Sequence, residues 1–423
     1  MIATASDGGR TGLVLYDDVR ARDFEPFATS RPISETRCGA LLVRERWEQV
    51  VQMPAAGFVS SEWLQGFAEF DAPPFVTGES LPAGTWLANS RALPHLGLAA
   101  SAIGQHDVLL IEGRVAAVRL SEMLSSDALR DGSMSLEELA SDSSNRRAID
   151  GVWLEHVWDM IATLTPLLVD DIPRLARECD AITLSSANSE SVMVLGSHPV
   201  WLEAGAVVEP FVTFDTHAGP VLLRRGAQVQ SFTRVVGPCY VGEHSVVMGD
   251  RIANCSIGPV CRAHGELSSS IFIGHANKGH DGFVGHSLLG RWVNLGAGTI
   301  TSNLKNTYGA VSLWTPTGTQ WTGQQFLGTL FGDHVKTGIG LSLTTGCVLG
   351  AGANVFERMP PKQVAPFSWG SGPGSYTEFT MDKFVSTAER MMQRRNVLVD
   401  DATRDYLRAV HRRGRGDVRW ERS

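Results

Sequence analysis

The pattern of hydrophobic and polar residues changes near residue 190. Beyond this point an aliphatic residue recurs about every six positions, with glycine or a small polar residue between repeats, as in VWLEAG, AVVEPF, VVMGDR and CVLGAG. A six-residue unit fits one side of a three-sided coil, because an inward aliphatic side chain fills the narrow interior and the corner turns tightly. The pattern therefore predicts a left-handed parallel β-helix over residues 190–370. An antiparallel β-sandwich would need hairpin turns, which are scarce here.

The first 147 residues follow a different pattern, in which short apolar runs alternate with stretches of helical spacing. Runs at 13–16 and 108–111 are typical of strands, and 40–51 has helical spacing. This alternation predicts an α/β domain over residues 1–147. Within it, the polar stretch 121–145 is expected to be a surface excursion.

Further segments complete the predicted organisation. Residues 148–189 are expected to form a connecting helix, and residues 371–423 a C-terminal helix with a basic tail. Two stretches, 271–283 and 303–331, interrupt the six-residue rhythm, and the second is expected to form an extended loop.

Composition and charge narrow the functional classes. The chain has 423 residues, 44 of them glycine, with 37 basic and 45 acidic side chains and a net charge of -8. This balance argues against a general nucleic-acid binder, and no apolar run approaches the roughly 18 residues of a membrane span. The six cysteines are scattered without a Cys-x-x-Cys pair. We therefore expect a cytoplasmic protein with reduced thiols.

One segment gathers the polar groups that a group-transfer reaction needs. Residues 278–306 read KGHDGFVGHSLLGRWVNLGAGTITSNLKN. This segment and the residues just before it contain imidazoles, amides and cations: His275, His280, His286, Asn294, Asn303, Lys278, Arg291 and Lys305. In a coil of about 18 residues per turn, residues near 280 and 298 lie one turn apart and are expected to face one groove.

The run GHDGFVGHSLLGRWVNLGAGTITSN resembles the acetyltransferase motif of bifunctional N-acetylglucosamine-1-phosphate uridyltransferase/glucosamine-1-phosphate acetyltransferases. The segments LYDD, WLANSRALP and GDHVKTGI are similar to a divergent branch of that family, described as sugar nucleotidyltransferases. The resemblance implies a homotrimer that transfers an acetyl group from acetyl-CoA to an amino-sugar phosphate, in the synthesis of UDP-N-acetylglucosamine or a related nucleotide sugar. Nucleotidyl transfer from UTP or another NTP, with Mg²⁺, is left open as a second activity.

The resemblance also implies roles for individual residues. His280 takes the position of the general base, a role that suits an imidazole because its ordinary pKa is about 6.5. Asn294 and Asn303 match the amides that recognise sugar and acetyl groups. Ala297 and Ala351 match positions where the coil meets coenzyme A.

Two departures concern phosphate and sugar recognition. Phe283 stands where the family has a tyrosine, and residues 267–270 read LSSS where it has paired lysines. Lys278, Arg291 and Lys305 are therefore the candidates for phosphate binding.

The N-terminal region departs further from the family. The cluster of Gly8, Gly9 and Gly12 precedes the first strand instead of following it, so the glycine-rich loop that cradles nucleotide phosphates is not expected here. Arg31 is the substrate-binding candidate that remains, with Asp17 and Asp18 as candidates for metal or ribose contacts.

Two alternatives belong to other functional classes. His275, His280 and His286 could form a three-histidine zinc site like that of the γ-type carbonic anhydrases, although the match over 294–303 favours a transferase that binds no metal in the coil. A non-catalytic trimeric scaffold that binds a sugar nucleotide is the other alternative.

Overall fold

The chain forms two compact units in a computed structural model that describes residues 11–78, 80–97, 103, 106–184, 191–356, 358–370 and 376–416. The first unit comprises the residues through Asp23, Arg31–Glu35 and Leu42–Glu155, and the second comprises the remainder. Two short N-terminal segments therefore belong to the second unit. They are tied to it by hydrogen bonds from Ser30 Oγ to Asp333 Oδ2 (2.7 Å) and from Ser256 Oγ to the Gly39 carbonyl oxygen (2.6 Å).

The first unit contains a mixed six-stranded sheet in the order β11-β8-β9-β6-β1-β4. Strand β1 pairs in parallel with both β4 and β6, so the carboxyl ends of these three strands lie at one edge. The predicted α/β domain is confirmed. Its main elements are β1 (Leu13–Tyr16), α1 (Val43–Val51), β4 (Ala55–Val59), β6 (Trp86–Asn89), β8 (Val108–Ile111), β9 (Arg114–Arg119) and β11 (Arg146–Ala148). Shorter strands in this unit are β5 (Ser80–Leu81), β7 (Ala92–Pro94), β10 (Leu124–Ser125) and β12 (Gly151–Trp153).

The polar stretch 121–145 lies largely at the surface, as expected, but a few of its side chains anchor it to the core of the sheet. It contains β10 and the short helix α2 (Leu136–Leu139), and Leu129, Leu136 and Ala140 are buried among the core residues of the sheet. A few apolar side chains at the right spacing anchor a segment whose average composition is polar.

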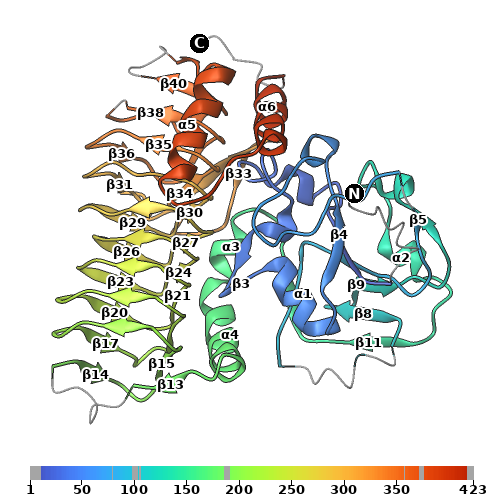
Figure 1. Cartoon of the computed structure of the whole chain (residues 1–423), viewed down its shortest axis with the longest axis horizontal. Coiled ribbons are helices and arrows are strands. Elements are labelled where there is room, and N and C mark those ends of the chain that lie inside the picture. Colours follow the sequence, from blue (N-terminus) through green and yellow to red (C-terminus); the bar gives the residue numbers. More distant parts are fainter. Residues whose placement is uncertain are drawn as a thin grey trace, which may run out of the picture. The chain divides into compact units, whose positions relative to one another are not determined.

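The second unit is a three-sided parallel β-solenoid, as predicted (Figure 1). Each turn passes through a first, a second and a third face, and most strands from β14 on pair in parallel with the strand one turn later, whereas β13 runs antiparallel to β15. The first face contains β13 (Ile182–Thr183), β15 (Val200–Leu202), β18 (Val221–Leu223), β21 (Cys239–Val241), β24 (Ser256–Ile257), β27 (Ile271–Phe272), β30 (Leu288–Leu289), β34 (Thr329–Phe331), β37 (Cys347–Leu349) and β39 (Gln363–Val364).

The other two faces are built in the same way. The second face contains β16 (Val207–Val208), β19 (Gln228–Val229), β22 (Val246–Val247), β25 (Arg262–Ala263), β28 (Asn277–Lys278), β35 (Lys336–Thr337), β38 (Asn354–Val355) and β40 (Ser368–Gly370). The third contains β14 (Met193–Leu195), β17 (Thr213–Asp215), β20 (Arg234–Val236), β23 (Arg251–Ala253), β26 (Glu266–Ser268), β29 (Phe283–Gly285), β31 (Ile300–Thr301) and β36 (Ser342–Leu343).

Two sequence expectations for the coil need correction. Residues 271–283 do not interrupt it, because β27 and β28 pair in register with the strands of the preceding turn. Most of residues 303–331 do leave the coil, which resumes at β34, but they contain an antiparallel hairpin of β32 (Ser312–Thr315) and β33 (Gly318–Trp321) in place of an extended loop.

Helices flank the coil at both ends of its sequence. The region expected as one connecting helix contains α3 (Asp159–Ala162) and α4 (Leu164–Glu178), and its last residues, 185–189, lie outside the described chain. The C-terminal region forms two helices, α5 (Met381–Gln393) and α6 (Asp401–Gly416), where one was expected. No helix among the described residues is long and apolar enough to cross a bilayer.

The coil interior is expected to dominate the stability of the second unit. Phe331 is 0 % exposed inside it, whereas Phe232 is 78 % exposed on its surface. Phe331→Ala should lower the free energy of unfolding by about 3–5 kcal/mol because it leaves a cavity, and Phe232→Ala by less than about 1 kcal/mol. Urea denaturation followed by circular dichroism measures both, and equal losses would contradict this account of the core.

Candidate functional site

The three histidines of the candidate segment lie at three different corners of one turn. His275 lies between β27 and β28, His280 between β28 and β29, and His286 between β29 and β30. They therefore do not converge within the chain, and the alternative zinc site is not formed there. Among the described residues, Asp250, His264 and Asp281 are the one group of at least three metal-ligating side chains.

We call the edge between the second and third faces the His280 corner. Its successive turns carry Asp250, His264, His280 with Asp281, Ala297 and Ile339. The His280 side chain is exposed, and so is Ala297 on the next turn. Ile339, one turn further, is 81 % exposed. Sequence reasoning did not single out Ile339, because only the stacking of turns aligns it with His280.

Lys278 anchors this corner from inside. Lys278 pairs in register with Ala263, and Ala263 pairs with Val247. Lys278 therefore occupies an inward register position, which the two preceding turns fill with a small and an aliphatic residue. Its ammonium group donates hydrogen bonds to the carbonyl oxygens of His264 (3.2 Å), Asp281 (3.0 Å) and His280.

These contacts correct the expected role of Lys278 in phosphate binding. The side chain is 0 % exposed, and an ammonium group has three donors, all of which are used here. Burial lowers the pKa of Lys278 to about 8. Lys278 therefore fixes the backbone from which His280 projects and is not available to a ligand.

Asn294 lies on the second face, in line with Asn277 and Lys336. The Asn277 side-chain amide donates to Asn294 Oδ1 at 2.8 Å, and Asn294 forms isolated β-bridges with both neighbours. The Lys336 ammonium group donates to the carbonyl oxygens of Trp292 (2.9 Å) and His334 (2.8 Å). Burial lowers the pKa of Lys336 to about 7. Lys336 is a cation that sequence reasoning missed.

Asn303 lies at the edge between the third and first faces, beside His286. Its Nδ2 is 2.9 Å from His286 Nδ1, and the His286 ring stacks on Phe326 with centroids 5.2 Å apart. Burial lowers the pKa of His286, so the neutral imidazole accepts this hydrogen bond through Nδ1. A cavity of 320 Å³ opens next to His286, lined also by Trp158, Asn254 and Gln324.

Phe283 lies on the third face, the face that separates the corner of His280 from that of Asn303. A Cβ atom on Gly285 would come within 2.5 Å of Phe283 Cζ and 2.7 Å of Asn303 Nδ2. The absence of a side chain on Gly285 therefore lets the Phe283 ring lie against the sheet, close to Asn303. His280 and Asn303 belong to different corners of the same chain.

The remaining residues predicted for the coil site are separated. The Lys305 ammonium group donates to the Ala310 carbonyl oxygen (2.6 Å) and lies 4.8 Å from the Trp321 ring centroid, within the inserted segment. Arg291 is buried, and its Nη1 is 3.4 Å from His275 Nδ1. Ala351 is 2 % exposed and lies between the first and second faces, away from the corner of Ala297. The two alanines therefore do not form one coenzyme A surface within the chain.

A second polar cluster lies in the first unit, at the carboxyl ends of β1 and β6. Arg91 Nη2 is 2.7 Å from Asp18 Oδ2, and the Asn89 amide donates to the same oxygen at 2.9 Å. Burial alone would raise the pKa of Asp18, but the hydrogen bonds and charge of Arg91 outweigh it and hold the pKa below its usual value. Glu155 joins the cluster through ion pairs with Arg91, at 3.4 Å, and Arg114.

Asp17 and Arg31 are buried in this unit and bind other protein groups there. Asp17 is buried and accepts hydrogen bonds from the Ser60 hydroxyl (2.6 Å) and the Ile33 backbone N–H (3.0 Å). Burial raises its pKa. Arg31, expected to bind substrate, is 1 % exposed, and its guanidinium group pairs with Glu69 at 2.9 Å. This pairing gives Arg31 a structural role.

The buried ammonium group of Lys278 should make stability depend on pH. The folded pKa of about 8 lies below the ordinary value of 10.5, so between these values the unfolded chain holds a proton that the folded chain has released. Raising the pH through this range therefore favours the folded state. Compared with Lys278→Met, the free energy of unfolding of the unmodified protein should rise from about pH 8 to about pH 10.5, as measured by urea denaturation. A constant difference across this range would contradict the assignment.

Comparison with known proteins finds similarity to sugar nucleotidyltransferases and to bifunctional nucleotidylyltransferase/acetyltransferases. Residues 13–180 match the sugar nucleotidyl transferase family. The bifunctional protein GlmU of Methanococcus vannielii is 32% identical over 117 residues, which are 27% of this chain and 26% of that protein. GlmU of Desulfitobacterium hafniense is 28% identical over 208 residues, 43% of each chain.

A third relative is the bifunctional sugar-1-phosphate nucleotidylyltransferase/acetyltransferase of Sulfurisphaera tokodaii, 31% identical over 91 residues, which are 22% of this chain and 23% of that protein. The chain thus spans less than half the length of each of these relatives. The resemblance noted from the sequence motifs is confirmed. Residues 13–180 thus match the sugar nucleotidyl transferase family, and parts of the chain are similar to bifunctional nucleotidylyltransferase/acetyltransferases.

Proposed function

We propose that the coil transfers an acetyl group from acetyl-CoA to the amine of an amino-sugar phosphate, with His280 as general base. The observation that carries this proposal is the His280 corner. An exposed imidazole projects there from a backbone that Lys278 holds through three carbonyl oxygens. The exposed Ala297 and Ile339 follow on the next turns of the same corner and provide an apolar edge for the acyl donor.

The chemistry needs only a positioned base and groups that orient the two substrates. The amine nitrogen attacks the thioester carbon, His280 accepts the amine proton, and the carbon–sulfur bond breaks to release coenzyme A. The His280 imidazole need not be buried for this role, since an exposed imidazole can pass the accepted proton on to water. Asn294 and Asn303 are the amides proposed to orient the sugar.

The separation of His280 and Asn303 within one chain supports a homotrimer. They lie at different edges of the third face, so a site that uses both residues would be completed by bringing corners of two copies together. The pathway to UDP-N-acetylglucosamine or a related nucleotide sugar is the proposed setting, because the relatives are named for nucleotidyl and acetyl transfer.

Nucleotidyl transfer in the first unit is a second candidate activity, which the family match over residues 13–180 favours. The cluster of Asp18, Arg91 and Glu155 lies where α/β sheets bind ligands, at the carboxyl ends of parallel strands. A Mg²⁺ ion does not fit this cluster, because both carboxylate oxygens of Asp18 accept hydrogen bonds from the Arg91 cation and Asp17 is buried away from it. We therefore derive no step through a metal.

His280→Ala should lower acetyl transfer by about 10²- to 10⁴-fold, because it removes the general base. The measurement is coenzyme A release from acetyl-CoA with amino-sugar phosphates as acceptors. His217→Ala is the matched control, since His217 is an exposed histidine elsewhere on the coil. Full activity of His280→Ala would refute this role, and binding of substrates without turnover by the unmodified protein would favour the scaffold alternative.

Asp18→Asn tests the second candidate separately. The change keeps the shape of the side chain but removes the negative charge that pairs with Arg91. We expect pyrophosphate release from an NTP and a sugar 1-phosphate to fall by at least about tenfold, while coenzyme A release is unchanged. An unaltered rate of pyrophosphate release would place nucleotide chemistry outside this cluster.

A further inference from the structure

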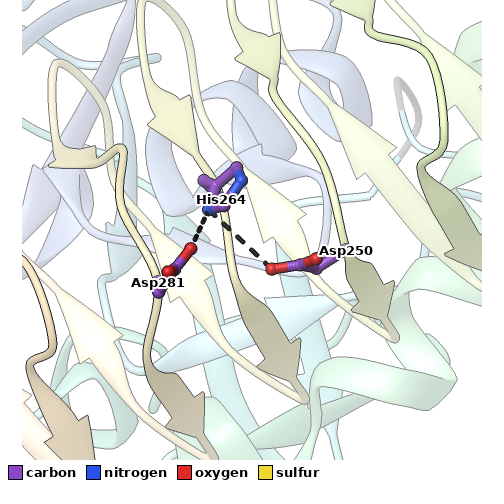
Figure 2. A group of neighbouring side chains, drawn as sticks. All are labelled: Asp250, His264 and Asp281. Atoms are coloured by element: carbon purple, nitrogen blue, oxygen red, sulfur yellow. Dashed lines mark ion pairs between the residues drawn. The ribbon is translucent and has the colours of Figure 1, made fainter.

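A histidine and two aspartates from successive turns meet at the His280 corner (Figure 2). His264 Nδ1 lies 3.4 Å from Asp281 Oδ1 and 3.8 Å from Asp250 Oδ2. Asp250 follows β22, His264 follows β25, and Asp281 follows β28. Only the register of the coil brings these residues together.

The His264 imidazole is oriented by its surroundings. A Cβ atom on Gly249 would lie 3.0 Å from His264 Nε2, so this side of the ring packs closely against the preceding turn and Nδ1 faces the carboxylates. Nδ1 is buried and makes no hydrogen bond within the described part of the chain. Lys278 holds the backbone of both His264 and Asp281 through their carbonyl oxygens.

The two spacings between His264 Nδ1 and the carboxylate oxygens are close to those around a tetrahedral metal ion, and all three ligand atoms lie within 4.8 Å of one another. Metal–ligand bonds of about 2.0–2.2 Å place neighbouring ligand atoms about 3.3–3.6 Å apart. The 3.4 Å separation between His264 and Asp281 fits this geometry. The 3.8 Å separation requires a shift of a few tenths of an ångström, which Asp250 can make because its side chain is 56% exposed.

The charge and chemistry of the group also favour a cation. Two carboxylates, of Asp250 and Asp281, approach the one imidazole of His264, so the group has an excess of negative charge that a cation would balance. One imidazole nitrogen and two carboxylate oxygens form a ligand set suited to a divalent transition metal. We propose that Asp250, His264 and Asp281 bind such an ion, with its remaining coordination positions open to solvent beside the 90% exposed Asp281.

If the coil transfers an acetyl group as proposed, a metal ion at this site would also help to bind the phosphate of the acceptor. The chain has no lysine in residues 267–270, and the ammonium group of Lys278 is enclosed by carbonyl oxygens. An ion with open positions at the His280 corner would supply the positive charge that the phosphate of the acceptor needs.

The test is binding of Zn²⁺ to the full chain by isothermal titration calorimetry after treatment with a chelator. We expect one ion per chain, with affinity weakened more than about tenfold in His264→Gln and in Asp281→Asn. The matched control is His217→Gln. His217 Nδ1 lies 2.7 Å from Asp215 Oδ1 on the same coil, but Asp215 also pairs with Arg234, and no second carboxylate among the described residues pairs with the ring. This control should bind Zn²⁺ like the unmodified protein.

Absence of stoichiometric Zn²⁺ binding would overturn the proposal, as would equal affinities of the unmodified protein and His264→Gln. Circular dichroism spectra that match the unmodified protein establish that the variants are folded. Calorimetry measures Zn²⁺ binding without turnover, so the two proposals can be judged separately. If Zn²⁺ does not bind but His280→Ala still abolishes coenzyme A release, only the metal proposal is overturned. If Zn²⁺ binds but His280→Ala releases coenzyme A at the unmodified rate, only the acetyl-transfer proposal is overturned.

Discussion

The narrow interior of the coil is the constraint on which the rest of this structure depends. Each strand contributes inward side chains that must fill a small cross-section, and Val235, Ile252 and Leu267 are stacked there with 0 % exposure. Polar groups are therefore displaced to the outer surface and the corners. Because turns stack in register, residues far apart in sequence align along one corner, and this alignment produces both the edge that follows His280 and the group around His264.

Lys278 shows how the coil accommodates a charge within this constraint. Its stem occupies an inward register position, while its ammonium group reaches three carbonyl oxygens at the corner. The cost of burial appears as a lowered pKa, and the benefit is a fixed backbone under the exposed His280. In the first unit, Arg31 likewise engages a carboxylate at a buried position, so Lys278 and Arg31, which were both expected to bind ligands, stabilise the protein itself.

The coil and the α/β domain were predictable because both depend on local periodicity. The strands at 271–272 and 277–278 were missed because Lys278 breaks the aliphatic rhythm, although its stem fills the same space. The core role of Leu129 and Leu136 was hidden by polar neighbours. His275, His280 and His286 looked like one cluster because they are close in sequence, whereas turns of the coil send them to separate corners. The Asp250–His264–Asp281 group has no local signal at all, since it arises only from register between turns.

The central claim is that acetyl-CoA binds along the corner that carries His280. Hydrogen–deuterium exchange of the full chain, with and without acetyl-CoA, tests this claim without requiring turnover or knowledge of the acceptor. We predict that the ligand slows exchange in residues 279–283, 296–300 and 338–341, which occupy the same corner on successive turns. Protection confined to another edge of the coil or to the first unit, with these three segments unchanged, would contradict the account.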